Sequence, residues 1–404
     1  MAKRIYLDHA ATTPLDPRVR RAMEPFLAAT FGNPSSLHRE GREARHAVEN
    51  ARGEVARLLG AEPSEILFTG NGSEADNLAL LGALGAANGG HVITSAIEHP
   101  AVLETCRHME RFGTEVTHLP ANADGLVEPR SLVAAIRPTT RLVSVMAANN
   151  VTGVLQPVAE LAQLAKEHGA LFHTDAVQAF GKIPMEVGKI PVDLISVSAH
   201  KLHGPKGVGA LYVRKGVEIL PIVHGGGQER GLRSATENVA GIVGLGEACR
   251  LAGEEMSSEA ARLVGLREQI LNGVTSAIPN VYIIGHPYRR LPGHLCLGFA
   301  GQEGESITLL LALDEAGVAV SSGSACSASH ADKPSYVLQA MGLDPIRARG
   351  SLRVTLGRFN TEEDVGRFLE ILPRAAAKMR PVATHPAFSA GLKEGEGDER
   401  NGPD

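Results

Sequence analysis

Short β-branched runs alternate with longer amphipathic stretches along most of the chain, and this alternation constrains the fold more than any other feature. The short runs predict strands at Ile66–Thr69, His91–Ser95, Glu115–Leu119, Leu142–Ala147, Ala170–Thr174, Leu194–Ser198 and Ala210–Val213. The amphipathic stretches predict helices at Arg39–Leu59, Glu74–Leu84, Pro100–Phe112 and Pro157–His168. Repeated βαβ units of this kind predict an α/β fold with a mostly parallel central sheet flanked by helices.

The pattern changes after the loop HGGGQERGLRSATEN and a long helical segment that continues to about Ile278. From Val281 onward, strand-like runs are interleaved with helix candidates at Glu305–Ala316 and Thr361–Leu372, which predicts a smaller α+β C-terminal domain. The end of the chain has few hydrophobes and is rich in Gly, Glu and Pro, which is typical of disorder. We therefore expect four parts: an N-terminal segment packing with the small domain (1–20), a large ligand-binding domain (21–260), the small domain (261–380) and a disordered tail (381–404).

Composition and charge exclude several classes of protein. A chain of 404 residues that is 43% hydrophobic can bury a sizeable core. Its net charge of -5 is interspersed, so we expect no direct contact with nucleic acid. The start, MAKRIYLDHAATTP, is not a signal peptide, and no apolar run has transmembrane length. These features predict a cytoplasmic enzyme with no membrane partner.

The cysteines divide into two kinds. Four are too few for a disulfide framework in a chain this long, and their spacing does not match a zinc site, so no metal is expected. Cys106, Cys249 and Cys296 fall within predicted helices or strands and are expected in the core. Cys326 lies in a run of Ser, Ala and Gly that would bury a thiol poorly. It is a candidate nucleophile on a flexible loop, and an incidental loop cysteine is the alternative.

An acid and a lysine follow two of the buried strands. Asp175 comes just past one strand end with Gln178 a helical turn later, and the next strand ends in Ser198, His200 and Lys201. Carboxyl ends of parallel strands meet where ligands bind. A partly desolvated lysine can form a Schiff base with an aldehyde, and a carboxylate can keep a pyridinium nitrogen protonated. The pair therefore points to pyridoxal 5′-phosphate (PLP), whereas a salt-bridged Asp and a solvent-facing Lys are the ordinary alternative.

A second group of residues is suited to the phosphate of such a cofactor. The strand Ile66–Thr69 runs into the Gly-rich turn of FTGNGSEADNLAL, where Ser73 can cap the following helix. Backbone N–H groups of Gly72 and Ser73 at a helix N-terminus form an anion site. The hydroxyl of Ser198 and the ring of His200 can also donate to a phosphate. Many helices begin this way without binding anything, so the prediction depends on the Lys/Asp pair.

Three more side chains are candidates for ring and substrate contacts. His99 lies between a strand and a helix and can stack on a flat ring and relay protons, or be an ordinary loop histidine. Asn150 follows a strand and can donate to a ring hydroxyl, although Asn is also common in turns. Arg353 lies in an apolar strand and suits a bidentate clamp on a substrate carboxylate, with an ordinary ion pair as the alternative.

Several motifs occur in one order along the chain, namely YLDHAATTP, GNPSSLH, NGSEADN, EHPAV, HTDAVQAFGK, SAHKLHGPKGVG, GGGQERGLRSATEN and SSGSACSAS. With them, residues 4–380 closely resemble a cysteine desulfurase of the NifS/IscS type. The resemblance implies a PLP-dependent transferase of fold type I and a homodimer with active sites at the subunit interface. It implies that sulfur is taken from L-cysteine, that L-alanine is released, and that a persulfide on an enzyme cysteine passes to an acceptor protein. That acceptor would serve iron–sulfur cluster assembly or tRNA thiolation.

The resemblance also assigns roles to the candidate residues. It implies that Lys201 binds the cofactor aldehyde, that Cys326 attacks the substrate sulfur and that His99 stacks on the ring and handles protons. The remaining roles are contacts to the cofactor and the substrate: Asp175 to the pyridine nitrogen, Gln178 and Asn150 to the ring hydroxyl, Asn150 and Arg353 to the substrate, and Gly72, Ser73, Ser198, His200 and, from the other subunit, Thr236 to the phosphate.

Three other classes of protein compete with this interpretation. A selenocysteine lyase or a small-substrate aminotransferase would share the fold, but transamination has no use for a nucleophilic thiol such as Cys326. A non-catalytic scaffold would not need Lys201, Asp175 and His99 together. A phosphate-loop hydrolase is poorly supported, because GPKG and NGSEAD lack the spacing of that loop.

Overall fold

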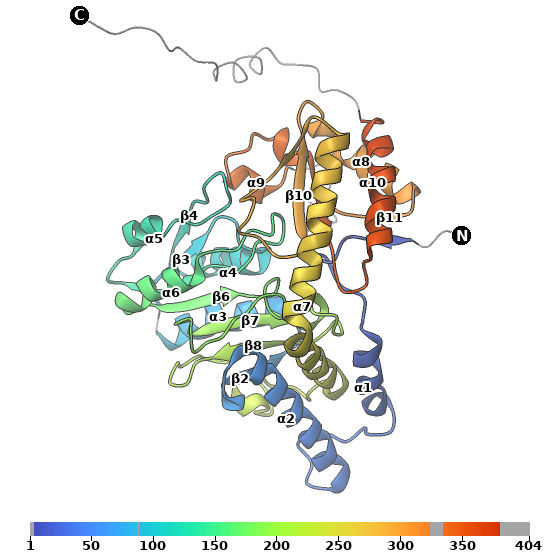
Figure 1. Cartoon of the computed structure of the whole chain (residues 1–404). Coiled ribbons are helices and arrows are strands. Elements are labelled where there is room, and N and C mark those ends of the chain that lie inside the picture. The colour runs from blue at the N-terminus through green and yellow to red at the C-terminus, as the bar shows by residue number, and fades with distance from the viewer. Residues whose placement is uncertain (1–3, 88, 324–333, 380–404) are drawn as a thin grey trace, which may run out of the picture.

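The fold is described by a computed structural model covering residues 4–87, 89–323 and 334–379 (Figure 1). Cys326 and the predicted tail (381–404) lie outside the described residues. The strands are β1 (Ile5–Tyr6), β2 (Ile66–Thr69), β3 (His91–Ser95), β4 (Glu115–Leu119), β5 (Thr140–Ser144), β6 (Leu171–Asp175), β7 (Leu194–Ser198), β8 (Gly209–Val213), β9 (Val281–Ile283), β10 (His294–Phe299), β11 (Val318–Ala319) and β12 (Ser351–Thr355). The α-helices are α1 (Pro17–Leu27), α2 (Arg39–Leu59), α3 (Gly72–Ala86), α4 (Pro100–Glu110), α5 (Pro129–Ala135), α6 (Val158–Glu167), α7 (Val239–Ala277), α8 (Ser306–Glu315), α9 (Tyr336–Ala340) and α10 (Glu362–Ala376).

A seven-stranded sheet in the order β2-β8-β7-β6-β5-β3-β4 forms the centre of the larger part of the chain. Neighbours from β7 through to β4 are parallel, and β8 runs antiparallel to both β2 and β7. The predicted mostly parallel sheet is therefore confirmed. The strand predicted at Leu142–Ala147 was placed too far along the chain, because β5 spans Thr140–Ser144. Val145 and Ala147 still donate backbone hydrogen bonds to His173 and Asp175, beyond which the chain turns away.

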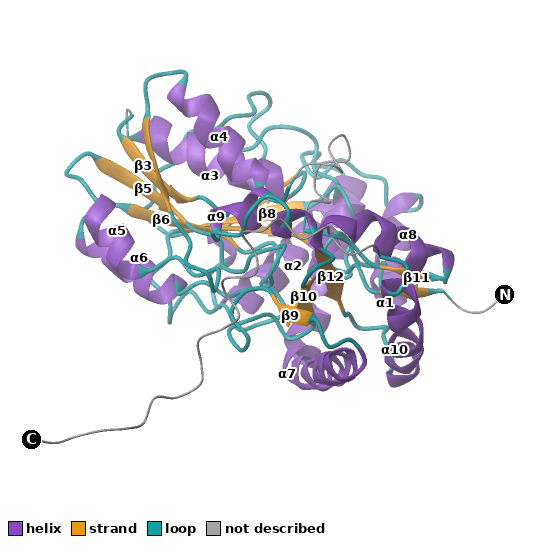
Figure 2. Cartoon of the chain, turned by 90° about the horizontal axis from the view of Figure 1, so that it is seen from above, coloured by secondary structure: helices purple, strands orange, loops and turns teal. Residues whose placement is uncertain are grey.

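Helices cover both faces of this sheet (Figure 2). On one face lie α3 and α4, and on the other lie α2, α5, α6 and α7. Because α3 packs against the middle of the sheet, Leu78, Ala79 and Leu80 are all buried and the helix has no polar stripe. The helix predicted at Arg39–Leu59 has those bounds as α2, and its end is marked by Gly60 with a left-handed φ of 64°.

The smaller part has its own antiparallel sheet, in the order β12-β10-β9, with α8 and α10 packed on it. The N-terminal strand β1 pairs with β11, and bridges from Asp8 to Thr355 and from Ser321 to Arg353 bring both segments beside β12. The long helix α7 packs against α1 and α2 at its start and against α10 near its end. It therefore connects the two parts along most of the molecule's length (Figure 1).

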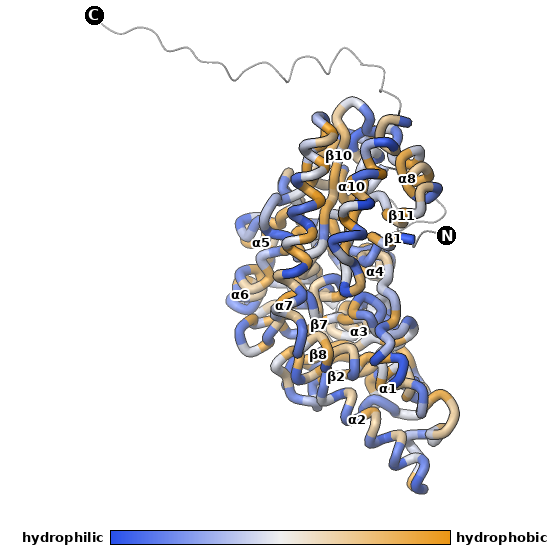
Figure 3. Tube along the Cα trace, turned by 45° about the vertical axis from the view of Figure 1, so that its right-hand side comes forward, coloured by the Kyte–Doolittle hydropathy of each residue, from blue (hydrophilic) through white to orange (hydrophobic). Residues whose placement is uncertain are grey.

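Apolar residues follow the sheets rather than the outer helices. Figure 3 shows orange along the central strands, while much of α2 is blue and white. Two of the apolar clusters lie on opposite faces of the large sheet, and a third fills the small part. Within the described ranges, no helix combines the length and the apolar composition that a membrane span requires.

Candidate active site

The carboxyl ends of the central strands open into a pocket of about 1120 Å³. Nine of the lining side chains, together with Gly72, were predicted from sequence: Ser73, His99, Asn150, Asp175, Gln178, Ser198, His200, Lys201 and Arg353. These residues come from segments far apart in the chain; the central sheet brings most of them together at its strand ends, and Arg353 comes from β12 of the small sheet. The structure shows that these residues line one pocket, and the role of each residue stays a prediction.

Lys201 lies in a short 3₁₀ helix, Ala199–Lys201, that directly follows β7. Its Nζ donates to two backbone carbonyl oxygens of the N-terminal segment, 2.6 Å from that of Ala10 and 2.7 Å from that of Ala11. The backbone of Thr13 in turn donates to the carbonyl of His200. The N-terminal segment therefore forms one wall of the pocket and positions the lysine.

Asp175 is the last residue of β6, rather than just past its end as predicted, and its Oδ1 accepts a hydrogen bond from the Val177 backbone at 2.9 Å. Burial raises the pKa of its carboxyl, and the nearby charges of His99 and Lys201 oppose that rise. Asp76 on α3 is buried beside it, and burial holds the pKa of Asp76 well above its usual range. This region of the pocket thus holds two buried carboxyls, both of which line the ligand space.

His99 caps the N-terminus of α4. Its Nδ1 accepts from the Ala101 backbone N–H at 3.1 Å, which leaves Nε2 for the pocket. Burial lowers the pKa of the ring, and the charge of Asp175 opposes this shift. The imidazole is therefore neutral near pH 7 and held in one orientation by the helix end.

The other end of the pocket is built around the start of α3. Asn71, rather than Ser73, caps this helix by accepting from the Glu74 backbone at 2.8 Å, so the capping prediction was wrong. A Cβ on Gly72 would lie 2.6 Å from Val177 Cγ2 and 3.3 Å from Ser198 Cβ, so only glycine lets these segments approach so closely. The hydroxyl of Ser198 is buried and has no hydrogen-bond partner among the described residues.

Arg353 on β12 reaches the pocket from the small part of the chain. Its Nη2 contacts Asp8 Oδ1 at 2.8 Å, and its Nη1 donates to the Asn150 carbonyl at 2.9 Å. Its Nε is buried and unpaired within the described ranges. The guanidinium is thus held by a carboxylate of the chain itself, at the place where a substrate carboxylate was predicted to bind.

Gln178 lies in the turn that follows β6, and its Nε2 donates to the Ala10 carbonyl at 2.9 Å. Two other predicted residues are not among those that share the pocket. Thr236 is exposed and lines a different, smaller pocket with Phe68 and Arg233. Cys326 falls outside the described residues, so its role stays a prediction.

Sequence reasoning missed four contributors to the site. Asp8, Ala10 and Ala11 belong to the motif YLDHAATTP, and they reach the pocket because β1 pairs with β11. Asp76 lies on the sheet-facing side of α3 among Ala75, Leu78 and Ala79, and this position was the available signal that it has a buried role. The other three had no local signal, since Ala10 and Ala11 contribute backbone carbonyls, which any residue can supply, and the Asp8 carboxylate reaches the site only through long-range pairing.

The residues present fit pyridoxal 5′-phosphate. The unpartnered Ser198 hydroxyl beside the first turn of the 15-residue helix α3 suits a phosphate, because helix N-termini favour anions. The buried Asp175 suits a ring nitrogen that carries a proton, and Lys201 suits an aldehyde. Asp76, His99 and Asp175 have ligand atoms within 4.8 Å of one another, and two of them, His99 and Asp175, are the residues predicted to contact the cofactor ring.

Comparisons with known proteins agree with this chemistry. Residues 5–368 match the family model of the class-V aminotransferases. The cysteine desulfurase IscS of Dictyoglomus turgidum is 49% identical over 95% of this chain and 98% of its own length. The mitochondrial cysteine desulfurase of Arabidopsis thaliana is 48% identical over 94% of this chain and 84% of its own length.

Solved structures show the same architecture. A NifS-like protein superposes with a TM-score of 0.86 at 41% identity, covering 93% of this chain and 99% of that one. SspA in complex with cysteine has a TM-score of 0.78 at 37% identity, covering 88% and 100%. The selenocysteine lyase and aminotransferase alternatives are not favoured by these relatives. The chain therefore belongs to the class-V aminotransferase family, among its pyridoxal-phosphate-dependent cysteine desulfurases of the NifS/IscS type.

Proposed function

We propose that this enzyme takes sulfur from L-cysteine, releases L-alanine and carries the sulfur as a persulfide on Cys326 to an acceptor protein. The observation that carries the proposal is the joint placement of Lys201, Asp175 and the unpartnered Ser198 hydroxyl in one pocket. When bound, the cofactor supplies an electron sink that allows bonds at the substrate's α-carbon to break. Binding, orientation and proton transfer fall to the chain's own residues.

Cofactor binding uses the pocket from end to end. Gly72, Ser73, Ser198 and His200 would hold the phosphate, and the Asp175 carboxylate would keep a proton on the ring nitrogen. Asn150 and Gln178 would contact the ring hydroxyl. Lys201 would hold the cofactor aldehyde through Nζ, which the carbonyls of Ala10 and Ala11 orient.

Substrate binding and proton transfer use residues of both parts of the chain. Arg353 binds the carboxylate of L-cysteine, and its present bond to Asp8 supports an ability to hold such a group. A bidentate contact between a guanidinium and a carboxylate fixes both distance and orientation. The neutral ring of His99 would stack on the cofactor ring, and its Nε2, which Nδ1 leaves free for the pocket, would take up and return the substrate's proton.

The thiolate of Cys326 accepts the substrate's sulfur, so a new S–S bond forms as the C–S bond breaks and the electron pair stays with the alanine moiety. The other cysteines are unsuited to this role. Cys106, Cys249 and Cys296 are buried, and burial raises the pKa of the Cys106 thiol to about 12. A thiol with such a pKa holds almost no thiolate near neutral pH.

A homodimer completes the proposed site, with Thr236 donating to the phosphate of the other subunit. Thr236 is exposed and lies outside the main pocket of its own chain. Its loop is anchored where buried Glu229 accepts from Arg52 Nη2 at 2.7 Å and from the Phe68 backbone at 2.8 Å. The segment between α1 and α2 also exposes apolar side chains, with Phe31 at 78% and Leu37 at 87%.

The sulfur acceptor is proposed as a protein of iron–sulfur cluster assembly or of tRNA thiolation, and the site of action as the cytoplasm. The names of the curated relatives support the first acceptor class more than the second. Pull-down of the cysteine-loaded enzyme, followed by persulfide detection on the captured protein, tests the acceptor directly.

The central experiment compares Cys326→Ala with Cys106→Ala. The first variant should keep the visible absorbance of the bound cofactor but produce neither L-alanine from L-cysteine nor a persulfide detectable by mass spectrometry. The second removes a buried thiol and should retain both products. Undiminished L-alanine formation by Cys326→Ala contradicts the assignment of the nucleophile.

A further inference from the structure

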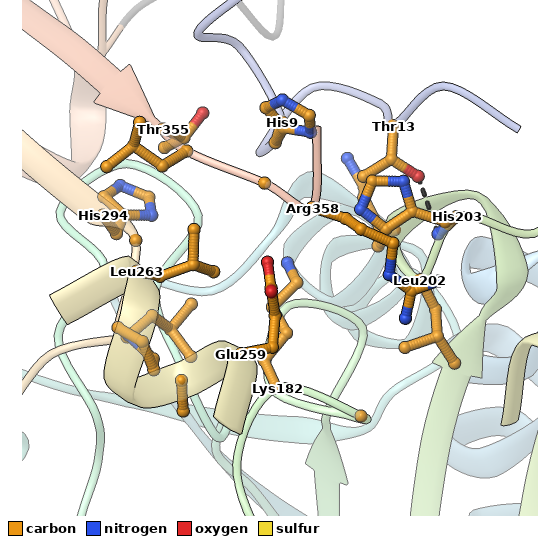
Figure 4. A pocket seen from close by; sticks show the side chains of 18 of the residues that line it. His9, Thr13, Lys182, Leu202, His203, Glu259, Leu263, His294, Thr355 and Arg358 are labelled. Carbon is orange, nitrogen blue, oxygen red and sulfur yellow. Dashed lines mark hydrogen bonds between the residues drawn. The ribbon is translucent and has the colours of Figure 1, made fainter. Parts of the chain in front are cut away.

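A second cavity adjoins the active-site pocket and shares Ala10, Gln178 and Lys201 with it (Figure 4). Its volume is about 720 Å³. Thr13 of the N-terminal segment and His203, which follows Lys201 by two residues, both line this cavity. Side chains that border a cavity have fewer packing partners on that side. Hydrogen bonds therefore contribute more than packing to holding these two segments together.

Thr13 connects the N-terminal segment to the backbone on both sides of Lys201. Its hydroxyl donates to the His200 carbonyl at 3.0 Å and accepts from the His203 backbone N–H at 2.8 Å, the bond that Figure 4 marks. Its own backbone N–H donates to the same His200 carbonyl at 2.9 Å. Thr13 is 5% exposed, so water does not readily replace these bonds when the hydroxyl is removed.

The backbone of His203 is left-handed, with a φ of 59°. A residue with a Cβ keeps this conformation only where its surroundings hold it. Three contacts of His203 come from the N-terminal segment. Besides the bond from its N–H to Thr13, its ring Nδ1 lies 3.0 Å from the Pro14 carbonyl oxygen, and its own carbonyl accepts from the Asp16 backbone at 3.0 Å. The N-terminal segment thus holds the path of the chain after Lys201.

The same segment also holds the side chain of Lys201, because Nζ donates to the carbonyls of Ala10 and Ala11. Nearer the start of the chain, the Ala10 N–H donates to Thr355 Oγ1 at 2.9 Å, which fixes the segment to β12 independently of Thr13. The two carbonyls contact only the amine, whereas Thr13 contacts the backbone on either side of the lysine.

We propose that Thr13 is a positioning residue whose hydroxyl fixes the backbone of Lys201, and with it the place from which the amine acts. Lysine carries its amine on a flexible four-carbon stem, so the backbone is the part that the fold can hold rigidly. A misplacement of about 1 Å in a reacting group can lower a rate about a hundredfold. This inference rests on the proposed role of Lys201.

The first test measures backbone protection rather than activity. Thr13→Val keeps the shape of the side chain but removes the hydroxyl, so the His203 N–H loses its acceptor. Amide hydrogen exchange at His203, measured in the full-length protein with and without PLP, should become at least about tenfold faster. Thr13→Ser keeps a donor and an acceptor and should retain the wild-type exchange rate.

The second test measures steady-state formation of L-alanine by the holoenzyme. In Thr13→Val, kcat should fall at least about tenfold, because two buried hydrogen bonds beside Lys201 are lost. KM for L-cysteine should stay within about twofold of the wild-type value, since Arg353 and the Ala10–Thr355 bond are untouched. Thr13→Ser should restore kcat.

Two further variants separate a lost hydroxyl from altered packing. Thr13→Ala removes the hydroxyl without placing a methyl group beside the His203 N–H, so it should lose kcat as Thr13→Val does even if the valine variant folds poorly. Thr275→Val is the matched control, because Thr275 is exposed and its hydroxyl donates to carbonyls of its own helix α7.

Three results overturn the inference. Unchanged exchange at His203 in Thr13→Val and Thr13→Ala means that the hydroxyl does not hold this backbone. A kcat of both variants within about twofold of the Thr275→Val value means that the hold has no effect on Lys201. An equal loss of kcat in Thr13→Ser assigns the effect to side-chain shape. Failure of the proposed function looks different, because the wild type then forms no L-alanine while exchange at His203 still responds to Thr13→Val.

Discussion

Gly72 offers the sharpest test of the phosphate site, since its side chain is a single hydrogen. In Gly72→Ala the new Cβ would lie 2.6 Å from Val177 Cγ2, closer than real Cβ contacts allow. Val177 is β-branched and cannot easily rotate its methyl away. Ser198 Cβ at the end of β7 would lie 3.3 Å from the new methyl as well, so the first turn of α3 must move away from both residues.

This movement weakens contacts to the cofactor phosphate. A hydrogen bond to a charged group contributes about 1.5–3 kcal/mol. Losing one of these bonds from the start of α3 therefore weakens PLP binding about 10- to 150-fold. The backbone at Gly72 does not have a left-handed φ, so alanine brings no conformational strain there beyond the clash.

The assay is titration of PLP into cofactor-free protein, followed by absorbance, with Gly53→Ala as the matched control. Gly53 lies on α2, and a Cβ added there would have nothing within 4 Å, so alanine should leave PLP affinity unchanged. It should also stabilise the helix by about 1 kcal/mol. The double variant Gly72→Ala/Val177→Ala removes the clashing methyl. Its affinity for PLP should therefore be close to that of Val177→Ala alone.

The reasoning is refuted by either of two results. An affinity of Gly72→Ala within about threefold of the Gly53→Ala value means that the close approach does not matter for the phosphate. A double variant that binds no better than Gly72→Ala means that the Val177 contact is not the cause.

Three further changes test two site residues and Glu98, a buried acid whose Oε1 accepts from the backbone N–H of the pocket-lining Met146 at 2.9 Å. Burial raises the pKa of Glu98 to about 8, so between about pH 5 and 8 the folded protein holds a proton that the unfolded chain has lost. The wild type should therefore lose stability relative to Glu98→Gln as the pH rises through this range, which thermal unfolding measures. Parallel stability curves for the two proteins would contradict this. Arg353→Lys cannot hold Asp8 and the Asn150 carbonyl together, so KM for L-cysteine should rise about tenfold, and an unchanged KM would remove Arg353 from substrate binding. Asp175→Asn cannot stabilise a protonated ring nitrogen, so kcat should fall at least about a hundredfold with a shifted cofactor spectrum, and a normal spectrum would contradict the assignment.

Much of the fold was predictable because its signals are local. The strands at Ile66–Thr69 and Leu194–Ser198 and the helix at Arg39–Leu59 have the predicted bounds, since buried parallel strands and amphipathic helices each leave a clear periodicity. The pairing of β1 with β11 was not predicted, because strands of two residues carry no period. It depends on a contact between Ile5 and Val318, far apart in the sequence.

The residues of the site likewise divide into those with a local sequence signal and those that depend on long-range pairing. Asp175, Ser198 and Lys201 lie at or directly after strand ends, so the rule that ligands bind at carboxyl ends of parallel strands was enough to group them. Asp8 reaches Arg353 only because β1 joins β11 beside β12, and no local pattern encodes that pairing.

The two ends of the pocket that we propose for the phosphate and for the substrate carboxylate consequently differ in physical origin. The proposed phosphate end is built by the start of α3 and the end of β7, and the close approach at Gly72 sets its geometry. The proposed carboxylate end is built by the small part of the chain, where Arg353 already has Asp8 as its partner. A substrate carboxylate bound by Arg353 would have to share or replace Asp8, so the affinity for the substrate would depend on the difference in free energy between two ion pairs. The affinity for the cofactor would instead depend on an anion site where the Ser198 hydroxyl has no hydrogen-bond partner among the described residues. Changes in the N-terminal segment should therefore alter KM for L-cysteine more than the affinity for PLP.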